Sequence, residues 1–270
     1  WITNKYNYNF KSNSDLLPNF NNSNKKLVLI HVTSVIIILA AFFVPILYMI
    51  NNIIVDFDNI DFFDVFKLSK NTIFISFIAS VLIVLVVLFI QYVKRISNSK
   101  FLNFIGEIIS LTYALPGAVI GISIILLFAP VNDSLGFLLI GSIPVLVYAY
   151  FIRYMAVAFS PILTSFRKHP KKLDDAGKSI GLKPFQFFRK IFIPLNKNAI
   201  IIAFCICFVD IMKDLPLTLI LRPFNFDTLA TQTYEYAIEE MITKSSIYSL
   251  TIIIFGVILL SILSIKQLKK

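Results

Sequence analysis

Six runs of mainly apolar residues limit the folds that this chain can adopt. They cover residues 27–50, 71–93, 103–130, 135–158, 192–212 and 246–265. A run of about 20 such residues is long enough to cross the hydrocarbon of a bilayer as one helix. With 57% hydrophobic and only 15% charged residues, the chain has more apolar surface than one soluble core could bury. The sequence therefore predicts an all-α polytopic membrane protein with six transmembrane helices.

The basic residues indicate how these helices are oriented, because Lys and Arg concentrate in the cytoplasmic loops of membrane proteins. The loop 151–190 holds nine basic residues, and others precede the first run, separate the second run from the third and end the chain. The segments 51–70 and 213–246 carry more acidic than basic residues, so we expect them outside. The pattern predicts a multi-pass membrane protein with both termini in the cytoplasm.

The start of the chain differs from the rest. Residues 1–25 are polar and rich in asparagine, and we interpret them as a linker or tail, with the transmembrane domain at 26–270. Residue 1 is Trp, so we expect that something preceded it. Either the chain is part of a longer protein, with this segment as a linker from an upstream half, or a short N-terminal piece was removed.

Several functions are disfavoured by what the sequence lacks. There is no Gly-x-x-x-x-Gly-Lys-Ser/Thr phosphate loop, so we expect no nucleotide site and no catalytic residues in this chain. The net charge of +10 is spread over loops without an aromatic platform, which argues against nucleic acid as a partner. Cys205 and Cys207 point to different faces of a helix, and His31 and His169 are isolated, so we expect no metal site.

Ion coupling is also disfavoured, because carriers driven by protons or sodium keep ionisable groups at mid-membrane depth. We expect the ionisable residues of these spans near the ends instead. Glu107 and Arg153 are placed near inner ends, and Asp210, Lys213 and Asp214 near the outer end of the fifth span. The spans also offer no obvious cluster of the hard oxygen ligands that ferric iron prefers.

The basic loop 161–194 is predicted to form two short amphipathic helices. The first is predicted from Pro161 to Ile180 and is ended by Gly181 in the left-handed conformation. The second begins at Pro184, and Pro194 marks the start of the fifth span. The apolar faces are predicted to be Leu173, Ala176, Gly177 and Ile180 on the first helix, and Phe185, Phe188, Ile191 and Phe192 on the second. Such a pair either docks into a partner or lies on the lipid surface.

This loop resembles the signature of binding-protein-dependent ABC importer permeases, which is Glu-Ala-Ala, three residues, Gly, nine residues and Ile-x-Leu-Pro. The residues that fall on the pattern are Asp175, Ala176, Gly177, Gly181, Ile191, Ile193 and Pro194. Asp175, Gly177 and Ile193 depart from it by small changes. In that family the loop forms coupling helices that sit in a groove of the cytoplasmic ATPase, so the resemblance implies a coupling role for these seven residues.

Two other segments resemble the ferric-iron importers of the same family. They are Tyr113-Ala-Leu-Pro-Gly-Ala-Val-Ile-Gly121 and the run 212–231, which begins Met-Lys-Asp-Leu-Pro where Lys-Glu-Leu-Pro is usual. Those permeases commonly join two six-span halves, and this chain resembles the second half. The likeness implies ferric iron as the cargo. Thiamine, sulfate, molybdate and putrescine permeases share the architecture and stay open as alternatives.

Four residues are candidates for the translocation pathway. Pro116 and Gly117 break the third span and free backbone carbonyls, which a membrane tolerates in packed protein or beside a cavity, so a packing kink is the alternative. Lys213 and Asp214 are adjacent and cannot face each other on a helix, so each needs another partner. For these two and for Arg222, simple interfacial anchoring is the alternative, and we favour it for Arg222.

The resemblance implies a permease subunit of an importer in a bacterial inner membrane, not an enzyme. Its implied partners are two ATPase subunits that bind ATP and Mg, a second permease half or copy, and an extracytoplasmic binding protein. No cofactor is expected in this chain. The alternatives from other classes are an ion-coupled secondary carrier and a membrane scaffold without transport activity.

Overall fold

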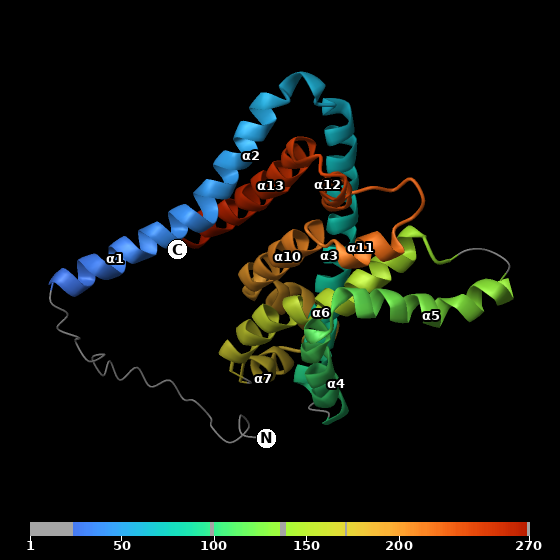
Figure 1. The fold of residues 1–270 in the computed structure, drawn as a ribbon. Helices are drawn as coiled ribbons and strands as arrows, with labels where there is room; N and C mark the ends of the chain where they lie inside the picture. Colours follow the sequence, from blue (N-terminus) through green and yellow to red (C-terminus); the bar gives the residue numbers. More distant parts are fainter. Residues whose placement is uncertain (1–23, 98–99, 136–138, 171, 269–270) are drawn as a thin grey trace. The chain divides into compact units, whose positions relative to one another are not determined.

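The computed structural model describes residues 24–97, 100–135, 139–170 and 172–268 (Figure 1). In these ranges every regular element is a helix, as predicted. Among the described residues, four helices are long and apolar enough to cross a membrane, and the number rises to six if each of two bent helix pairs is one span. The chain divides into two compact units, residues 1–48 and 49–270, which are described separately. Most of the predicted tail 1–25 lies outside the described residues.

The first unit holds most of one continuous apolar helix. It comprises α1 (Asn24–Ile38), a π-helical turn (Leu39–Phe43) and the first part of α2 (Val44–Val55). The Val44 amide donates to the Leu39 carbonyl just before Pro45, whose ring cannot fit a regular turn. The span runs from Leu27 to Val55, five residues beyond the predicted end.

Three helices form the core of the second unit, namely α3 (Phe62–Ser97), α6 (Ile143–Lys168) and α10 (Lys197–Met212). Small side chains lie where they meet, because Ala79, Ala158 and Ala203 are completely buried. Such residues let helix backbones approach closely in a membrane protein. We predicted the fourth span from residue 135, but α6 begins at Ile143, since Gly141 has a positive φ of 78° and Pro144 suits a first turn.

The third span is broken where proline predicts a break. Helix α4 (Lys100–Leu111) continues into a 3₁₀ turn (Thr112–Ala114), and α5 (Gly117–Leu135) follows at an angle of 113°. Leu115 is extended because the ring of Pro116 disfavours helical geometry in the residue before it. The break at Pro116 and Gly117 is therefore confirmed.

The basic loop differs from the prediction at its start. Helix α6 passes through Pro161 and ends at Lys168, and α7 (Lys172–Ser179) is a separate helix, so the predicted helix 161–180 was wrong. Pro170 explains the break, because it has no amide hydrogen and keeps His169 extended. The second predicted helix does begin at Pro184, as α8 (Pro184–Phe187).

A π-helical turn (Phe188–Phe192) and α9 (Ile193–Leu195) complete the loop, and α10 then leaves at an angle of 74°. The turn into the fifth span therefore lies at Asn196 and not at Pro194. The Asn196 side chain is buried, donates to the Phe192 carbonyl over 2.8 Å and accepts from the Ser165 hydroxyl over 2.7 Å. These bonds replace helix bonds at the bend.

The rest of the second unit begins with the end of α2 and a 3₁₀ turn (Phe57–Asn59). After α10 come α11 (Pro216–Leu221), α12 (Leu229–Ile238) and α13 (Ile242–Leu268). Helix α11 packs against α5, and α12 packs against α13 and α3. Leu68, Leu229 and Tyr248 form a second, smaller apolar cluster there.

Candidate functional site

The segment 172–195, which we call the elbow, is held in a sharp bend. Helix α7 ends in a Schellman motif, in which the Gly181 amide donates to the Lys178 carbonyl (2.9 Å) and the Leu182 amide to the Gly177 carbonyl (3.1 Å). Gly181 has a φ of 75°, the left-handed conformation expected from the sequence. A β-carbon on Gly177 would overlap the Phe187 ring, so glycine permits α7 and α8 to touch.

Arg95, at the end of α3, clamps the elbow to the membrane helices. Its Nε lies 2.8 Å from a carboxylate oxygen of Asp174 on α7. Its Nη1 donates to the carbonyls of Phe166 (2.9 Å) and His169 (3.1 Å), and its Nη2 donates to Pro170 (3.1 Å). The guanidinium also stacks over the Phe192 ring at 5.1 Å. One side chain therefore joins α3, the end of α6, α7 and the π-helical turn.

Aromatic rings fill the inside of the elbow. The Tyr92 hydroxyl donates to the Pro184 carbonyl over 2.6 Å, and its ring lies 4.5 Å from that of Phe188. Phe187 and Phe192 are buried, whereas Phe185 is 72% exposed. The predicted apolar face of the second helix was therefore wrong at Phe185, because the short α8 and the π turn bring Phe187 inward instead.

The structure divides the predicted coupling residues into two groups. Gly177 is buried, and Ile191 and Ile193 are half-buried, so these residues pack inside the elbow. Asp175, Ala176, Gly181 and Pro194 are exposed. The neighbouring Ile180 is also exposed, at 71%. Ala176, Ile180 and Phe185 thus present apolar side chains that the second unit leaves uncovered, and we call these three residues the outer face of the elbow.

A second group of residues forms a polar pocket of about 260 Å³. Its polar lining residues are Tyr113, Arg153, Tyr154, Asp210, Lys213 and Asp214. The Asp214 carboxylate accepts from the Tyr154 hydroxyl and from the Leu217 amide (2.9 Å), and it lies 3.6 Å from Arg153 Nε. The bond from Leu217 gives a partner to an amide in the first turn of α11, which begins at Pro216.

Gly117 allows the two broken spans to meet beside this pocket. A β-carbon at residue 117 would overlap Arg153 Nη1 and lie 3.3 Å from Pro216. Any side chain there would displace the guanidinium. The Nε and Nη1 atoms of Arg153 are buried and have no hydrogen-bond partner among the described residues. The positive charge of Arg153 is therefore stabilised by the Asp214 carboxylate and by the Tyr154 ring, whose centroid is 5.6 Å away.

The charged residues of the polar pocket lie at other positions than the sequence predicted. Arg153 was placed near the inner end of the fourth span and Asp214 near the outer end of the fifth, yet the two are in contact. Arg153 lies ten residues into the 26-residue α6, close to its middle. The expectation that Arg153 lies near the end of its helix was therefore wrong, and it meets Asp214 because α10 ends at Met212, four residues before Pro216.

The structure places three of the four predicted pathway residues at or beside the polar pocket and the fourth elsewhere. Gly117 and Asp214 are buried beside Arg153, and Lys213 lines the pocket with a 59% exposed side chain that lies 2.9 Å from Asp210. Pro116 is exposed and does not line the pocket. Sequence reasoning missed Tyr113 and Tyr154. Tyr150 and Tyr154 are one helical turn apart, which was the available signal for a polar stripe on α6.

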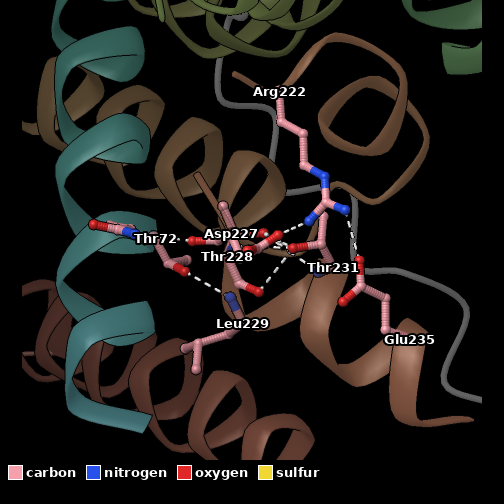
Figure 2. A network of polar contacts seen from close by, with 8 residues as sticks. Thr72, Arg222, Asp227, Thr228, Leu229, Thr231 and Glu235 are labelled. Atoms are coloured by element: carbon pink, nitrogen blue, oxygen red, sulfur yellow. Dashed lines mark hydrogen bonds and ion pairs between the residues drawn. The ribbon is translucent and has the colours of Figure 1, made fainter. Parts of the chain in front are cut away.

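Arg222 takes part in a polar network that ties the loop after α11 to α12 and α3 (Figure 2). Its guanidinium pairs with Asp227 and lies 2.6 Å from Glu235. Thr228 and Thr231 form a capping box at the start of α12, and the Leu229 amide donates to the Thr72 hydroxyl over 2.9 Å. Arg222 therefore has two carboxylate partners within the protein, which the sequence did not predict.

Comparisons with known proteins agree with this architecture. Residues 95–268 match the family described as binding-protein-dependent transport system inner membrane component. The Fe(3+)-transport system permease protein FbpB 2 of Haemophilus influenzae is 26% identical over 146 residues. That match covers 54% of this chain and spans 28% of the length of the relative.

Solved structures show the same fold at low identity. A bacterial ABC transporter involved in the import of the acidic polysaccharide alginate has a chain with a TM-score of 0.69 and 13% identity, covering 91% of this chain and 96% of that one. The methionine ABC transporter MetNI, in inward-facing conformations, gives a TM-score of 0.57 and 17% identity over 75% of this chain and 92% of that one. Because the family match covers well over half of its residues, the chain belongs to the inner membrane components of binding-protein-dependent transport systems.

Proposed function

We propose that this chain is the permease half of an ATP-driven importer, coupled through the elbow to two separate ATPase subunits and supplied by an extracytoplasmic binding protein. The observation that carries the proposal is the outer face of the elbow. Ala176 on α7 and Ile180, directly after its end, are exposed apolar residues, and Arg95 holds the helix through Asp174. An exposed apolar face on a rigid element suits docking into the groove of a partner.

The elbow has the connections that a coupling element needs. Arg95 and Tyr92 fix it to α3, and the Phe192 ring packs against Phe166 of α6, with ring centroids 4.4 Å apart. The buried Asn196, which precedes α10, donates to the Phe192 carbonyl and so joins the elbow to α10. These are the three helices of the core. A displacement of the elbow by a closing ATPase pair would therefore move the core helices together. This is a rigid-body route to alternating access.

We further propose that the cargo is ferric iron. The likeness to a ferric-iron permease supports this assignment, as does the chemistry of the polar pocket. Tyr113, Tyr154, Asp210 and Asp214 bring phenol and carboxylate oxygens to one pocket, which are ligand types that Fe³⁺ prefers. The carboxylates are paired with Arg153 and Lys213, and the described residues contain no group of three or more His, Cys, Asp or Glu side chains that could hold a metal ion. Lys213 and Arg153 share the pocket, so its polar groups suit brief contact with an ion more than tight retention.

The test is uptake by the complete transporter in liposomes, comparing wild type with Ala176→Glu and with Gly181→Pro. Asn198→Asp is the matched control, because it adds the same charge at an exposed position outside the elbow. We expect ATP-dependent uptake of ⁵⁵Fe³⁺ in wild type and control, and its loss in both elbow variants with the chain still inserted. Normal uptake in either elbow variant would refute the docking role. ATP-dependent uptake of thiamine, sulfate, molybdate or putrescine, with no uptake of iron, would refute ferric iron as the cargo.

An ion-coupled carrier is the second candidate, because the Arg153–Asp214 pair lies near the middle of α6. The two functions respond differently to the energy source. A carrier would keep its uptake without ATP and lose it when the ion gradient is collapsed. The importer would do the reverse.

A further inference from the structure

A separate pocket of about 310 Å³ lies where the C-terminal ends of α3 and α6 meet the start of α4. We call it the basic pocket. Its polar lining residues are Gln91, Lys94, Arg95, Asn103, Arg167 and His169. It shares no residue with the polar pocket. It adjoins the elbow through Arg95, which pairs with Asp174, and through Phe166 and His169, whose rings lie 4.4 and 6.4 Å from that of Phe192.

The charges around the basic pocket are not balanced. Arg95 is paired with Asp174, but Lys94 and Arg167 form no ion pair with any described residue and repel each other. No acidic side chain is among the described lining residues, and Glu107 acts on Lys94 from outside the lining. Arg95 donates to the carbonyls that end α6, whereas Lys94 and Arg167 donate to none of the described carbonyls. Capping the helix ends therefore does not explain these two cations.

Gln91 supplies an independent sign of a missing ligand. Its side chain is only 2% exposed, and its amide nitrogen Nε2 has no hydrogen-bond partner among the described residues. A buried donor without an acceptor is costly and uncommon in a folded protein. An anion with several oxygens in the basic pocket would accept from Gln91 and neutralise Lys94 and Arg167 together.

We propose that the basic pocket binds a phosphate group, supplied either by the headgroup of an anionic phospholipid or by free phosphate. The surroundings favour the lipid. Phe101 and Phe104 lie on α4 close in sequence to the lining residue Asn103, and they are 68% and 59% exposed. Exposed apolar side chains beside a basic pocket match the acyl chains and headgroup of one lipid. A bound headgroup would also touch the α3 end that clamps the elbow.

The experiment measures lipid retention by the full chain, purified in detergent and analysed by native mass spectrometry after exposure to phosphatidylglycerol or phosphatidylcholine. Sodium phosphate is titrated in a parallel arm and followed by thermal stabilisation. The variants are Arg167→Gln, Lys94→Gln and Gln91→Leu. Lys168→Gln is the matched control, because it removes the same charge one residue from Arg167 without lining the pocket.

We expect wild type to retain phosphatidylglycerol in preference to phosphatidylcholine. Loss of either cation should weaken retention about fivefold, the usual effect of one basic residue beside an anionic lipid. Gln91→Leu should weaken it without a change in charge, and Lys168→Gln should not. Stabilisation by phosphate in wild type but not in Arg167→Gln, without lipid selectivity, would assign the pocket to free phosphate.

Two results would overturn the proposal. Equal losses in Arg167→Gln and Lys168→Gln would mean that only general surface charge attracts the lipid. If the folded wild type binds neither lipid nor phosphate, the pocket is no phosphate site, and an acidic segment of a partner protein would be the ligand to test next. Because no ATPase, cargo or binding protein is present, either result is independent of the proposed transport function.

Discussion

Phe187 occupies the space that a side chain on residue 177 would need. Its Cε2 atom lies 2.6 Å from the position of a β-carbon on Gly177, and its ring is buried between α7 and the π turn. The contact explains why this chain has glycine where the permease signature has a second alanine. We predict that Gly177→Ala destabilises the protein by about 1–3 kcal/mol, the usual cost of overpacking. Thermal unfolding in detergent measures it.

The control is Gly256→Ala on α13, where the β-carbon would meet Val209 at an ordinary 3.8 Å. That change should be neutral or slightly stabilising, because alanine is the better helix former. Phe187→Leu should relieve part of the cost of Gly177→Ala. If Gly177→Ala costs the same stability with and without Phe187→Leu, the ring is not the cause.

Arg95 and Asp174 give the second prediction. Asp174→Asn removes the charge that holds α7 to α3, in a pair whose side chains are 10% and 20% exposed. We expect a loss of about 1–2 kcal/mol, less than for a fully buried pair. Amide hydrogen exchange should become faster in α7 and stay unchanged in the core of α6.

Arg95→Lys should have a similar effect, because a lysine cannot donate to Asp174 and three carbonyls at once. Lys178→Gln is the control. It breaks the Lys178–Asp175 pair, in which both side chains are about three-quarters exposed, and should leave exchange unchanged. Unchanged exchange in Asp174→Asn would show that the clamp does not hold the elbow.

Thr228 gives the third prediction. Its hydroxyl accepts from the Thr231 amide at the start of α12, inside the network of Figure 2. Thr228→Ala should cost about 1 kcal/mol as the loss of a helix cap. Thr164→Ala is a suitable control, since that exposed hydroxyl bonds only to the carbonyl one turn before it. Thermal unfolding measures both variants. If Thr228→Ala loses no more stability than Thr164→Ala, the capping role is contradicted.

Much of the helical fold could be predicted from hydropathy, because runs long enough to cross a bilayer have few alternatives to a helix. Proline and glycine marked local breaks equally well, as the bend at Pro116 and the left-handed Gly181 show. The helix predicted through residues 161–180 failed because the prediction gave the spacing of Leu173, Ala176 and Ile180 more weight than Pro170. At such a junction a proline is the stronger signal, because its missing amide hydrogen and its ring act on the backbone directly.

The contacts between spans could not be predicted. Arg153 and Asp214 are 61 residues apart, and the sequence placed Arg153 near the inner end of the fourth span and Asp214 near the outer end of the fifth. Their meeting depends on where α10 stops, which Pro216 sets, and on the missing side chain of Gly117. Likewise Arg95 was only one of several basic residues in a loop. Its role follows from four carbonyl and carboxylate partners that come together only in the fold.

The Arg153–Asp214 pair gives the last prediction. The Asp214 side chain is 1% exposed, and the charge of Arg153 has no other carboxylate within ion-pair distance among the described residues. Asp214→Asn keeps an acceptor for the Leu217 amide but leaves the Arg153 charge buried and unpaired. We expect a loss of about 3 kcal/mol in stability, typical of breaking a buried pair from one side. Uptake should fall as well.

The double variant Arg153→Gln with Asp214→Asn should recover most of the stability, because no unpaired charge remains. It should not recover uptake if the charges themselves serve transport. Lys213→Gln provides the comparison, since its 59% exposed side chain makes a pair with Asp210 that solvent screens. Unfolding in detergent and ATP-dependent uptake in liposomes separate the two effects. Full recovery of uptake in the double variant would show that the Arg153–Asp214 pair has only a structural role.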